Sequence, residues 1–335
     1  MDIDKRIKAF ARLGQRIANL TDEQRLQLYD RAVAANRWFT ADNIAMALSG
    51  IGRFLDEDTL TNWLQRYQLP AESKTVGLVM AGNIPLVGFH DMMSVLLAGH
   101  RAQVKLSSQD SILPRALADL LLEEEPAFAD RLQFVDKLQN SDAVIATGSD
   151  NSARYFKKYF GHLPHIIRQN RTSAAVLTGH ETPDELNGLG SDIFSYFGLG
   201  CRNVAKLYVP QGYDFASLFE ALQPYEEVFN HPKYFNNYEY NKAIYLVNRT
   251  PHLDTGFALF KEDTGLVSPL AVVYYEEYED MKQVTASLAQ YAHKLQCVVG
   301  KANTDRPMIP FGQAQFPAVD DYADNVDTLK FLCRI

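Results

Sequence analysis

The sequence predicts an α/β protein in which two α/β domains follow a helical N-terminal extension. Three observations predict this fold. Apolar residues recur at helical spacing through residues 1–70, short apolar runs alternate with helical patterns from Thr75 onward, and a second such alternation follows residue 180. Strands that alternate with helices are typical of mostly parallel sheets covered by helices.

The composition is that of a globular protein. The chain has 335 residues, of which 47% are hydrophobic and 22% charged. This length exceeds what one hydrophobic core usually supports, so we expect two domains. The balance of 33 basic against 41 acidic residues gives a net charge of −8. That charge favours neither nucleic acid nor anionic lipid, so we expect no nucleic-acid partner.

The cysteines and the N-terminus indicate a cytoplasmic protein. Cys201, Cys297 and Cys333 are odd in number and widely spaced, which excludes a disulfide framework and a zinc site of the CxxC type. The first six residues are largely charged, and no run of about 18 apolar residues occurs. We therefore expect reduced thiols and no membrane span.

Four helical patterns make up the N-terminal extension, residues 1–70. Thr21, Thr40 and Asp58 precede apolar periodic runs and are predicted N-caps. The predicted helices cover residues 4–20, 22–39, 41–55 and 58–69.

The first α/β domain is predicted over residues 71–180 and the second over residues 181–310. Residues 311–335 are expected to return to the first domain. We interpret the aromatic stretch 234–241 as an ordered loop. Strands are predicted at 75–80, 102–106, 132–136, 142–147, 165–169, 173–177, 203–210, 243–248, 271–276 and 296–300, and helices at 86–98, 113–122, 151–159, 184–197 and 280–292.

The first candidate for chemistry is AGNIPLVG, residues 81–88, between a strand and a helix. Gly82 allows close backbone approach, Asn83 offers an amide donor, and Pro85 suits the first turn of a helix. Ligands of α/β proteins bind at the carboxyl ends of strands. In the alternative interpretation, Asn83 only caps the next helix.

Two further strand ends carry polar groups. Lys105 ends the strand of AQVKLSS, where a lysine can hold ribose or phosphate, although a solvated lysine is the alternative. Thr147, Gly148 and Ser149 join a strand directly to a helix, so backbone N–H groups there can bind a cofactor phosphate. A plain serine N-cap is the alternative for this turn.

Several other patterns predict no site. No G-x-G-x-x-G follows a predicted strand, and the G-x-G at 188–190 lies in a helix. His162 and His165 lack further residues at metal-ligand spacing, so we expect surface histidines and no metal. The acidic residues 320, 321, 324 and 327 lack the spacing of a calcium loop and are interpreted as helix caps or a solvated face.

Cys201 is the candidate nucleophile. It lies in YFGLGCRNVAKLYVP, where Gly198 and Gly200 leave space beside the sulfur and Arg202 can favour the thiolate. A buried, inert thiol is the alternative interpretation. Cys297 fits that alternative because it lies within an apolar strand, and Cys333 is expected to have no role.

Together these segments resemble the aldehyde dehydrogenase superfamily, and within it the LuxC-like acyl-CoA reductases, over roughly residues 75–332. AGNIPLVG, VKLSS, IATGS and GLGCRNVAKLYVP carry the resemblance, together with GLVSPLAVVYYE and PFGQAQFPAVDDYADNVDTLKFL. The resemblance implies an aldehyde-dehydrogenase-like fold, in which residues 71–180 form the NAD(P)-binding domain and residues 181–310 the catalytic domain. It implies that Asn83 stabilises an oxyanion, that Lys105 grips the adenosine ribose, that Gly148 and Ser149 lie under the cofactor phosphates, and that Cys201 is the nucleophile.

The sequence departs from the family pattern at two places. Hydrolytic aldehyde dehydrogenases carry E-L-G-G-K where this chain has Ile167-Arg168-Gln169-Asn170-Arg171, and the glutamate before F-G-P is absent near residues 266–269. A base that activates water would hydrolyse an acyl-enzyme, so its absence suits thioester reduction.

The resemblance therefore implies reduction of a long-chain fatty acyl thioester to the aldehyde by NADPH or NADH through an acyl-cysteine. The substrate would be acyl-CoA or an acyl carrier thioester, and the protein a homo-oligomer, either a dimer or a tetramer. Two alternatives are a cysteine-dependent acyltransferase or thioesterase and a non-catalytic nucleotide-binding member of the family.

Overall fold

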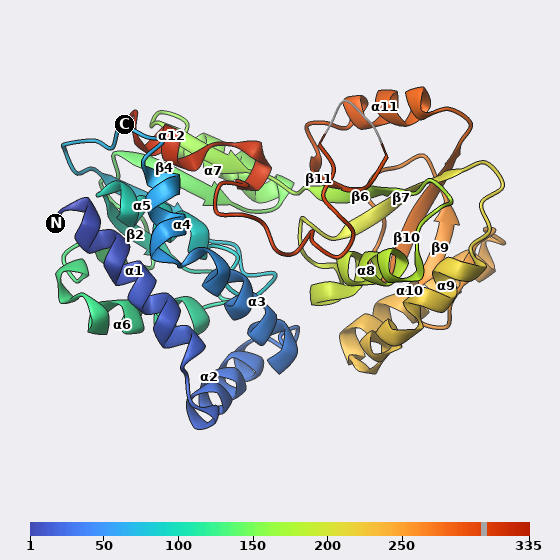
Figure 1. The fold of residues 1–335 in the computed structure, drawn as a ribbon, viewed down its shortest axis with the longest axis horizontal. Helices are drawn as coiled ribbons and strands as arrows, with labels where there is room; N and C mark the ends of the chain where they lie inside the picture. Colours follow the sequence, from blue (N-terminus) through green and yellow to red (C-terminus); the bar gives the residue numbers. More distant parts are fainter. Residues whose placement is uncertain (303–306) are drawn as a thin grey trace. The chain divides into compact units, whose positions relative to one another are not determined.

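A computed structural model describes residues 1–302 and 307–335 (Figure 1). The chain forms two compact units. Unit 1 comprises Met1–Asn170 and Ala318–Ile335, and unit 2 comprises Arg171–Pro317. The units divide after Asn170 and not near residue 180, and the C-terminal return begins at Ala318 and not at 311. The boundary lies earlier in the chain than predicted because of strand β6 (Thr172–Val176). We expected β6 in the first domain, but it pairs with strands of the sheet in unit 2.

The predicted helical extension is confirmed as part of unit 1. The N-caps Thr21 and Thr40 are also confirmed, since each hydroxyl accepts the backbone N–H three residues on. Asp58 as a cap was wrong: Asp56 caps the fourth helix by accepting the Thr59 N–H at 3.0 Å. The helices are α1 (Ile3–Ala18), α2 (Asp22–Ala35), α3 (Ala41–Phe54) and α4 (Glu57–Leu64).

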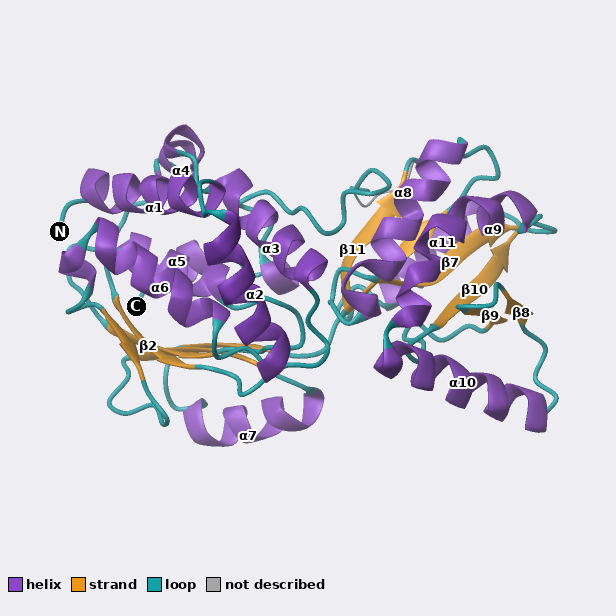
Figure 2. Cartoon of the chain, turned by 90° about the horizontal axis from the view of Figure 1, so that it is seen from below, coloured by secondary structure: helices purple, strands orange, loops and turns teal. Residues whose placement is uncertain are grey.

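Unit 1 contains a five-stranded sheet in the order β3-β2-β1-β4-β5, and every pairing in it is parallel. Figure 2 shows α5 and α6 on one face of this sheet and α7 on the other. The strand order reverses between β1 and β4, which makes this edge the switch point where α/β sheets bind ligands. The elements are β1 (Thr75–Val79), α5 (Phe89–Ala98), β2 (Arg101–Lys105), α6 (Leu113–Glu124), β3 (Leu132–Phe134), β4 (Ala143–Thr147), α7 (Asp150–Phe160), β5 (His165–Arg168) and α12 (Thr328–Leu332), with short 3₁₀ helices at Pro126–Phe128 and Ala323–Asn325.

Unit 2 contains a six-stranded sheet in the order β11-β6-β7-β10-β9-β8, parallel except for the β8–β9 pair. Helix α11 lies on one face and α8 and α9 on the other (Figure 1). The elements are α8 (Pro183–Phe194), β7 (Val204–Pro210), α9 (Ala216–Leu222), α10 (Pro232–Val247), β8 (Leu253–Asp254), β9 (Leu259–Glu262), β10 (Val272–Tyr278), α11 (Met281–Gln290) and β11 (Leu295–Gly300), with 3₁₀ segments at Ser195–Gly198 and Gln223–Asn230.

Helix α10 corrects two predictions. The expected loop at 234–241 lies inside this helix, and so does the expected strand at 243–248 except for its last residue, which is the C-cap. Pro232 occupies its first turn, and Tyr234, Tyr238, Asn241 and Tyr245 repeat every three or four residues as its buried face. The aromatic and β-branched residues favour strands only weakly, and burial of this face overrides that preference. Within the described part of the chain, no helix has the length and apolarity required to span a bilayer.

Candidate active site

Three of the predicted segments meet at the carboxyl edge of the sheet in unit 1. Strand β1 lies between β2 and β4, so that Val79 is in register with Lys105 on one side and with Ala146 on the other. The loops that follow these three strands carry Asn83, the residues after Lys105, and the Thr147–Ser149 turn. The fold thus gathers, at one sheet edge, groups that are far apart in the sequence.

Asn83 is a half-buried residue in the loop between β1 and α5. Helix α5 begins at Phe89, and its N-cap position is occupied by Gly88, which makes no side-chain cap. The interpretation of Asn83 as a helix cap was therefore wrong, and so was the placement of Pro85 in the first helical turn. Gly82 is required by close packing, because a Cβ there would lie 2.8 Å from the Asp110 nitrogen.

Asp110 is a buried acid for which the sequence predicted no role. Its Oδ2 accepts the N–H of Leu86 at 2.7 Å, which ties the Asn83 loop to the loop that follows Lys105. Leu86 has a φ of 59°, so this bond holds a backbone conformation that leucine rarely adopts. Burial raises the pKa of the Asp110 carboxyl to about 7. The signal available in the sequence was an acidic residue five positions after Lys105 and shortly before the predicted helix at 113–122.

Lys105 is exposed at the end of β2. Both interpretations, a lysine that holds ribose or phosphate and a solvated lysine, require this exposure. Ser149 is the N-cap of α7, since its Oγ accepts the N–H of Ser152 at 3.3 Å, and a helix start capped in this way is compatible with both interpretations of the turn. Gly148 packs tightly against α7, where an added Cβ would lie 2.8 Å from Ser152 Cβ. The remaining N–H groups of the first turn of α7 point away from the helix toward its amino end.

Cys201 lies in unit 2, in a turn that leads into β7. It is half-buried and forms no disulfide. Before it, Tyr196, Phe197 and Gly198 have φ angles of 52°, 59° and 78°, three consecutive residues in the left-handed region. This conformation suits glycine but strains tyrosine and phenylalanine. The backbone that leads into the Cys201 turn is therefore strained, and surrounding contacts must hold it in this conformation.

Asn203 supplies those contacts. Its Oδ1 accepts the N–H of Gly200 at 2.8 Å. Its Nδ2 donates to the carbonyl oxygens of Ile193 and Ser195 at 3.2 and 2.8 Å, at the end of α8. One buried amide thus joins both sides of the turn and fixes Cys201 relative to α8.

Arg202 and Asp192 attach a second segment to the Cys201 turn. The Arg202 guanidinium donates to the Ala314 carbonyl at 3.4 Å. The buried carboxylate of Asp192 accepts the N–H groups of Gly312 and Ala314 at 2.7 and 3.0 Å. Burial raises the pKa of Asp192 to about 6. Part of the PFGQAQFP segment is therefore fastened to the Cys201 turn inside unit 2.

Similarity to known proteins identifies the family of this chain. The family model for acyl-CoA reductase (LuxC) matches residues 8–218. The chain belongs to the LuxC acyl-CoA reductase family. A long-chain acyl-protein thioester reductase of Aliivibrio fischeri is 23% identical over 264 residues, which cover 67% of this chain and 54% of the relative. The chain thus spans about half the length of that curated relative.

Solved structures show the fold. An NADP-dependent enzyme of E. coli has a TM-score of 0.67 at 14% identity, covering 91% of this chain and 74% of its own. An aldehyde dehydrogenase of Bacillus cereus in complex with NAD+ has a TM-score of 0.63 at 15% identity, covering 96% and 83%. The fold of this LuxC-family chain is that of the aldehyde dehydrogenases, as predicted.

The other two thiols differ from Cys201 in their surroundings. Cys297 is buried within β11, which agrees with the inert thiol that its apolar strand predicted. Cys333 follows α12, and burial, with a smaller effect from Asp327, raises the pKa of its thiol. The raised pKa disfavours the thiolate of Cys333.

The histidine and acidic patterns have the following settings in the structure. His162 and His165 are exposed, and no three His, Cys, Asp or Glu side chains come together as metal ligands in the described ranges 1–302 and 307–335. Asp327 caps α12, and Asp320 pairs with Arg66 at 2.8 Å. Within the acidic run, Asp327 is therefore a helix cap and Asp320 a charge of a surface ion pair.

The segment Ile167–Arg171 carries a structural ion pair in this LuxC-family chain. Arg168 is buried at the end of β5, where its guanidinium pairs with Asp91 of α5 and donates to Thr328 Oγ1 at 2.9 Å. It thereby connects the sheet, α5 and α12 within unit 1. The segment holds no carboxylate that could activate water.

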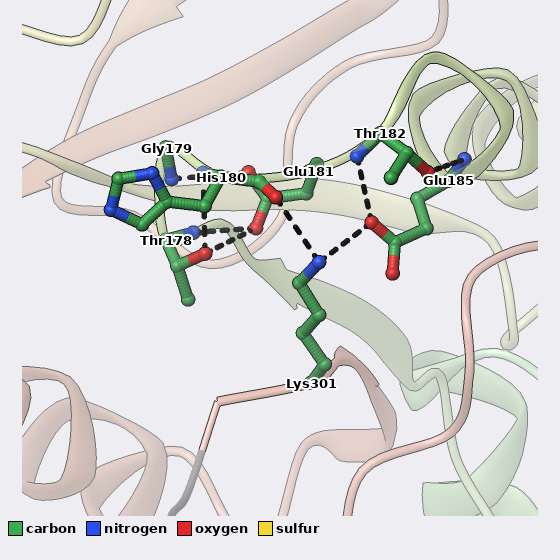
Figure 3. Close-up of polar contacts among 7 residues, drawn as sticks. All are labelled: Thr178, Gly179, His180, Glu181, Thr182, Glu185 and Lys301. Atoms are coloured by element: carbon green, nitrogen blue, oxygen red, sulfur yellow. Dashed lines mark hydrogen bonds and ion pairs between the residues drawn. The ribbon is translucent and has the colours of Figure 1, made fainter.

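A polar network at the carboxyl edge of the sheet in unit 2 is structural (Figure 3). Lys301 follows β11 and pairs with Glu185 of α8 at 2.7 Å, while donating to the His180 carbonyl at 3.2 Å. Glu181 accepts the N–H groups of Thr178 and Gly179 at 2.7 and 3.1 Å. These contacts fasten the ends of β6 and β11 to the start of α8, whereas Cys201 precedes the amino end of β7.

Proposed function

We propose that this protein reduces a fatty acyl thioester, such as an acyl-CoA, to the aldehyde with NADPH or NADH, through an acyl group on Cys201. Membership of the LuxC family and the aldehyde dehydrogenase fold support acyl reduction by an oxidoreductase with a nicotinamide cofactor. The observation that carries the proposal is the half-buried Cys201 thiol in a turn fixed on both sides by Asn203. A long-chain acyl thioester is the substrate that the name of the A. fischeri relative suggests.

The chemistry proceeds in two stages at Cys201. The thiolate attacks the thioester carbonyl, the bond from that carbon to the carrier sulfur breaks, and the carrier leaves as a thiol after taking up a proton. The bound cofactor supplies the hydride that reduces the acyl carbon. The bond to Cys201 sulfur then breaks, which releases the aldehyde and restores the thiolate.

Asn83 is assigned the oxyanion role in both stages. Negative charge develops on the acyl oxygen during acylation and again during reduction, and an amide N–H donor stabilises it. Loss of one such donor costs about 3–4 kcal/mol in comparable oxyanion holes. The Asp110 carboxylate, through the N–H of Leu86, keeps the Asn83 loop in its observed conformation.

The residues of unit 1 fit a dinucleotide. Parallel strands end at a switch point, Lys105 is exposed at the end of β2, and Gly148 brings the backbone close to the amino end of α7. Lys105 would hold the ribose, and Thr147, Gly148 and Ser149 would lie under the phosphates.

The absence of a carboxylate in residues 167–171 supports reduction over hydrolysis. Arg168 occupies this segment and is engaged with Asp91 and Thr328. With no carboxylate in this segment to activate water, the acyl group on Cys201 should persist until it is reduced. Free fatty acid is therefore expected to be a minor product beside aldehyde.

The test begins with acyl-CoA in the absence of NAD(P)H. The Cys201 peptide should gain the mass of the acyl group, and Cys201→Ala should abolish that adduct. Cys297→Ala is the matched control and should leave the adduct unchanged. An adduct on Cys297 instead would overturn the assignment of the nucleophile.

A second step separates reduction from the alternatives. Adding NADPH or NADH should convert the adduct to aldehyde and consume the reduced cofactor, which is followed by its absorbance. Release of fatty acid without cofactor, at a rate equal to reduction, would replace the proposal with a thioesterase. No adduct and no cofactor consumption across a panel of acyl-CoAs would favour a non-catalytic member of the family.

A further inference from the structure

Ser173 lies where the sheet of unit 2 is irregular on both sides. It is the second residue of β6 and is fully buried. Toward β7, Ser173 pairs with Val204 but Ala174 pairs with Lys206, so the register shifts by one residue. Toward β11, the register also shifts between Leu295 and Val298. Such irregularities re-aim side chains and occur often beside active sites.

The Ser173 hydroxyl connects the Cys201 turn to β11. Its Oγ lies 3.1 Å from the carbonyl oxygen of Cys201 and 3.1 Å from the sulfur of Cys297. It also accepts the Cys297 N–H at 3.2 Å. A hydroxyl has one proton to donate. When the Ser173 hydroxyl donates its proton to the Cys201 carbonyl, the Cys297 thiol must be the donor in its contact with the Ser173 oxygen.

The backbone of Ser173 adds a second attachment to the same turn. Its N–H donates to the Asn203 carbonyl at 3.1 Å. Ser173 thus holds the turn at both ends of the three-residue stretch from Cys201 to Asn203. The Cys201 carbonyl belongs to the residue that carries the nucleophile, so fixing this carbonyl restricts the direction of the thiol.

The hydroxyl is unexpected in its surroundings. All five residues of β6 are buried, and three of them are alanine or valine. A buried hydroxyl is unfavourable unless it is hydrogen-bonded. An alanine would fill this position at no such cost, and the partners that the hydroxyl finds are the nucleophile's residue and Cys297.

We propose that Ser173 is a positioning residue that orients Cys201 for attack on the acyl thioester. This inference rests on the proposed function. Ser173 acts through the main chain of Cys201 and does not touch the substrate. The role of Cys297 is to donate to Ser173, and its thiol takes no part in acyl transfer.

The test measures single-turnover acylation of Cys201 by acyl-CoA, read as the mass of the Cys201 peptide. Ser173→Ala should lower the maximal acylation rate roughly ten- to a hundredfold, with the half-saturating acyl-CoA concentration unchanged, because orientation is lost while binding is not. Alkylation of Cys201 by iodoacetamide needs no precise orientation and should stay within about threefold of the wild-type rate.

Two controls accompany this variant. Ser287→Ala removes a hydroxyl that pairs with Tyr208 at 2.8 Å in the same unit and should leave acylation unchanged. Cys297→Ala keeps the bond from Ser173 to Cys201 and should acylate at close to the wild-type rate. If Ser173→Ala fails to fold, Ser173→Cys, which has nearly the same shape but is a weaker donor, should still slow acylation.

The outcomes separate this proposal from the proposed function. Wild-type protein that forms no adduct, yet is alkylated at Cys201, would overturn both the acyl-enzyme and this role of Ser173. Wild-type protein that forms the adduct beside a Ser173→Ala variant that forms it equally fast would overturn the role of Ser173 alone. Equal slowing of acylation and alkylation, with a lowered melting temperature, would make Ser173 a purely structural residue.

Discussion

The Nε2 atom of His100 lies 2.9 Å from the carbonyl oxygen of Leu332, which fastens the C-terminal helix α12 to the start of β2 within unit 1. The other ring nitrogen, Nδ1, accepts the N–H of Lys74 at 3.0 Å. An imidazole that accepts through one nitrogen and donates through the other is neutral. The fully buried His100 ring therefore holds these two segments only while it is uncharged.

This bond predicts a loss of stability in mild acid. Burial lowers the pKa of His100 below its ordinary value of 6.5, so the unfolded chain takes up a proton more readily than the folded one. The contribution of His100 to stability is complete above about pH 6.5 and declines as the pH falls below it. Asp110 and Asp192 have raised pKa values that act in the opposite direction, so the decline is read as the difference between the wild type and His100→Gln in urea unfolding at about pH 8 and about pH 5.5. Between these pH values the variant should lose less unfolding free energy, or gain more, than the wild type.

The exposed His165 serves as the control for this measurement. His165→Gln should keep the wild-type dependence of unfolding free energy on pH. A His100→Gln variant whose dependence matched that of the wild type would contradict the role given to the ring.

Asp192→Asn should destabilise unit 2. Both carboxylate oxygens of Asp192 accept backbone N–H groups, from Gly312 and Ala314. An asparagine has one oxygen, so its NH₂ group would face one of those N–H donors. Leaving a buried donor unpaired costs about 1–3 kcal/mol, measured as a lower free energy of unfolding.

Asp184→Asn is the matched control, because Asp184 is an exposed residue of the same helix. It should change the unfolding free energy by less than about 0.5 kcal/mol. Equal effects of the two variants would show that the buried contacts of Asp192 contribute nothing specific.

The strand ends are predictable from the sequence, whereas their supports are not. The apolar runs of β1, β2 and β4 locate the carboxyl ends of these strands, so Asn83, Lys105 and Ser149 stand out in the sequence alone. Parallel pairing then explains why these ends lie together. Asp110 and Ser173 were missed because each acts through contacts between segments distant in sequence.

The wrong predictions also come from contacts between segments, which the local sequence does not specify. Strand β6 was assigned to the wrong domain because its sequence gives its burial but not its pairing partners, β7 and β11. Asp56 and Asp58 both precede the apolar positions of α4, and the choice between them depends on where the preceding chain turns. In α10, tertiary burial of one tyrosine-rich face overrode the strand preference of those residues.

Asn83→Ala should lower kcat and leave cofactor binding nearly unchanged. An oxyanion donor acts mainly in the transition state, so its loss should reduce kcat roughly a hundred- to a thousandfold. Asn62→Ala, which changes an exposed asparagine of α4, is the matched control for steady-state rates and for the Kd of NADPH and NADH. A change confined to the cofactor Kd would show that Asn83 is a cofactor ligand.

Lys105→Ala should weaken cofactor binding and spare acylation. Lys105 is exposed at the carboxyl end of β2, beside the switch point where ribose groups bind in α/β folds. Removal of a charge-assisted hydrogen bond costs about 1.5–3 kcal/mol, which raises the Kd roughly ten- to a hundredfold. Fluorescence titration with NADPH and NADH measures this change, and Arg101→Ala, an exposed cation at the other end of β2, is the control. Acylation of Cys201 needs no nicotinamide, so equal damage to cofactor-free acylation and to reduction would mean that Lys105 supports the fold or the thioester carrier instead.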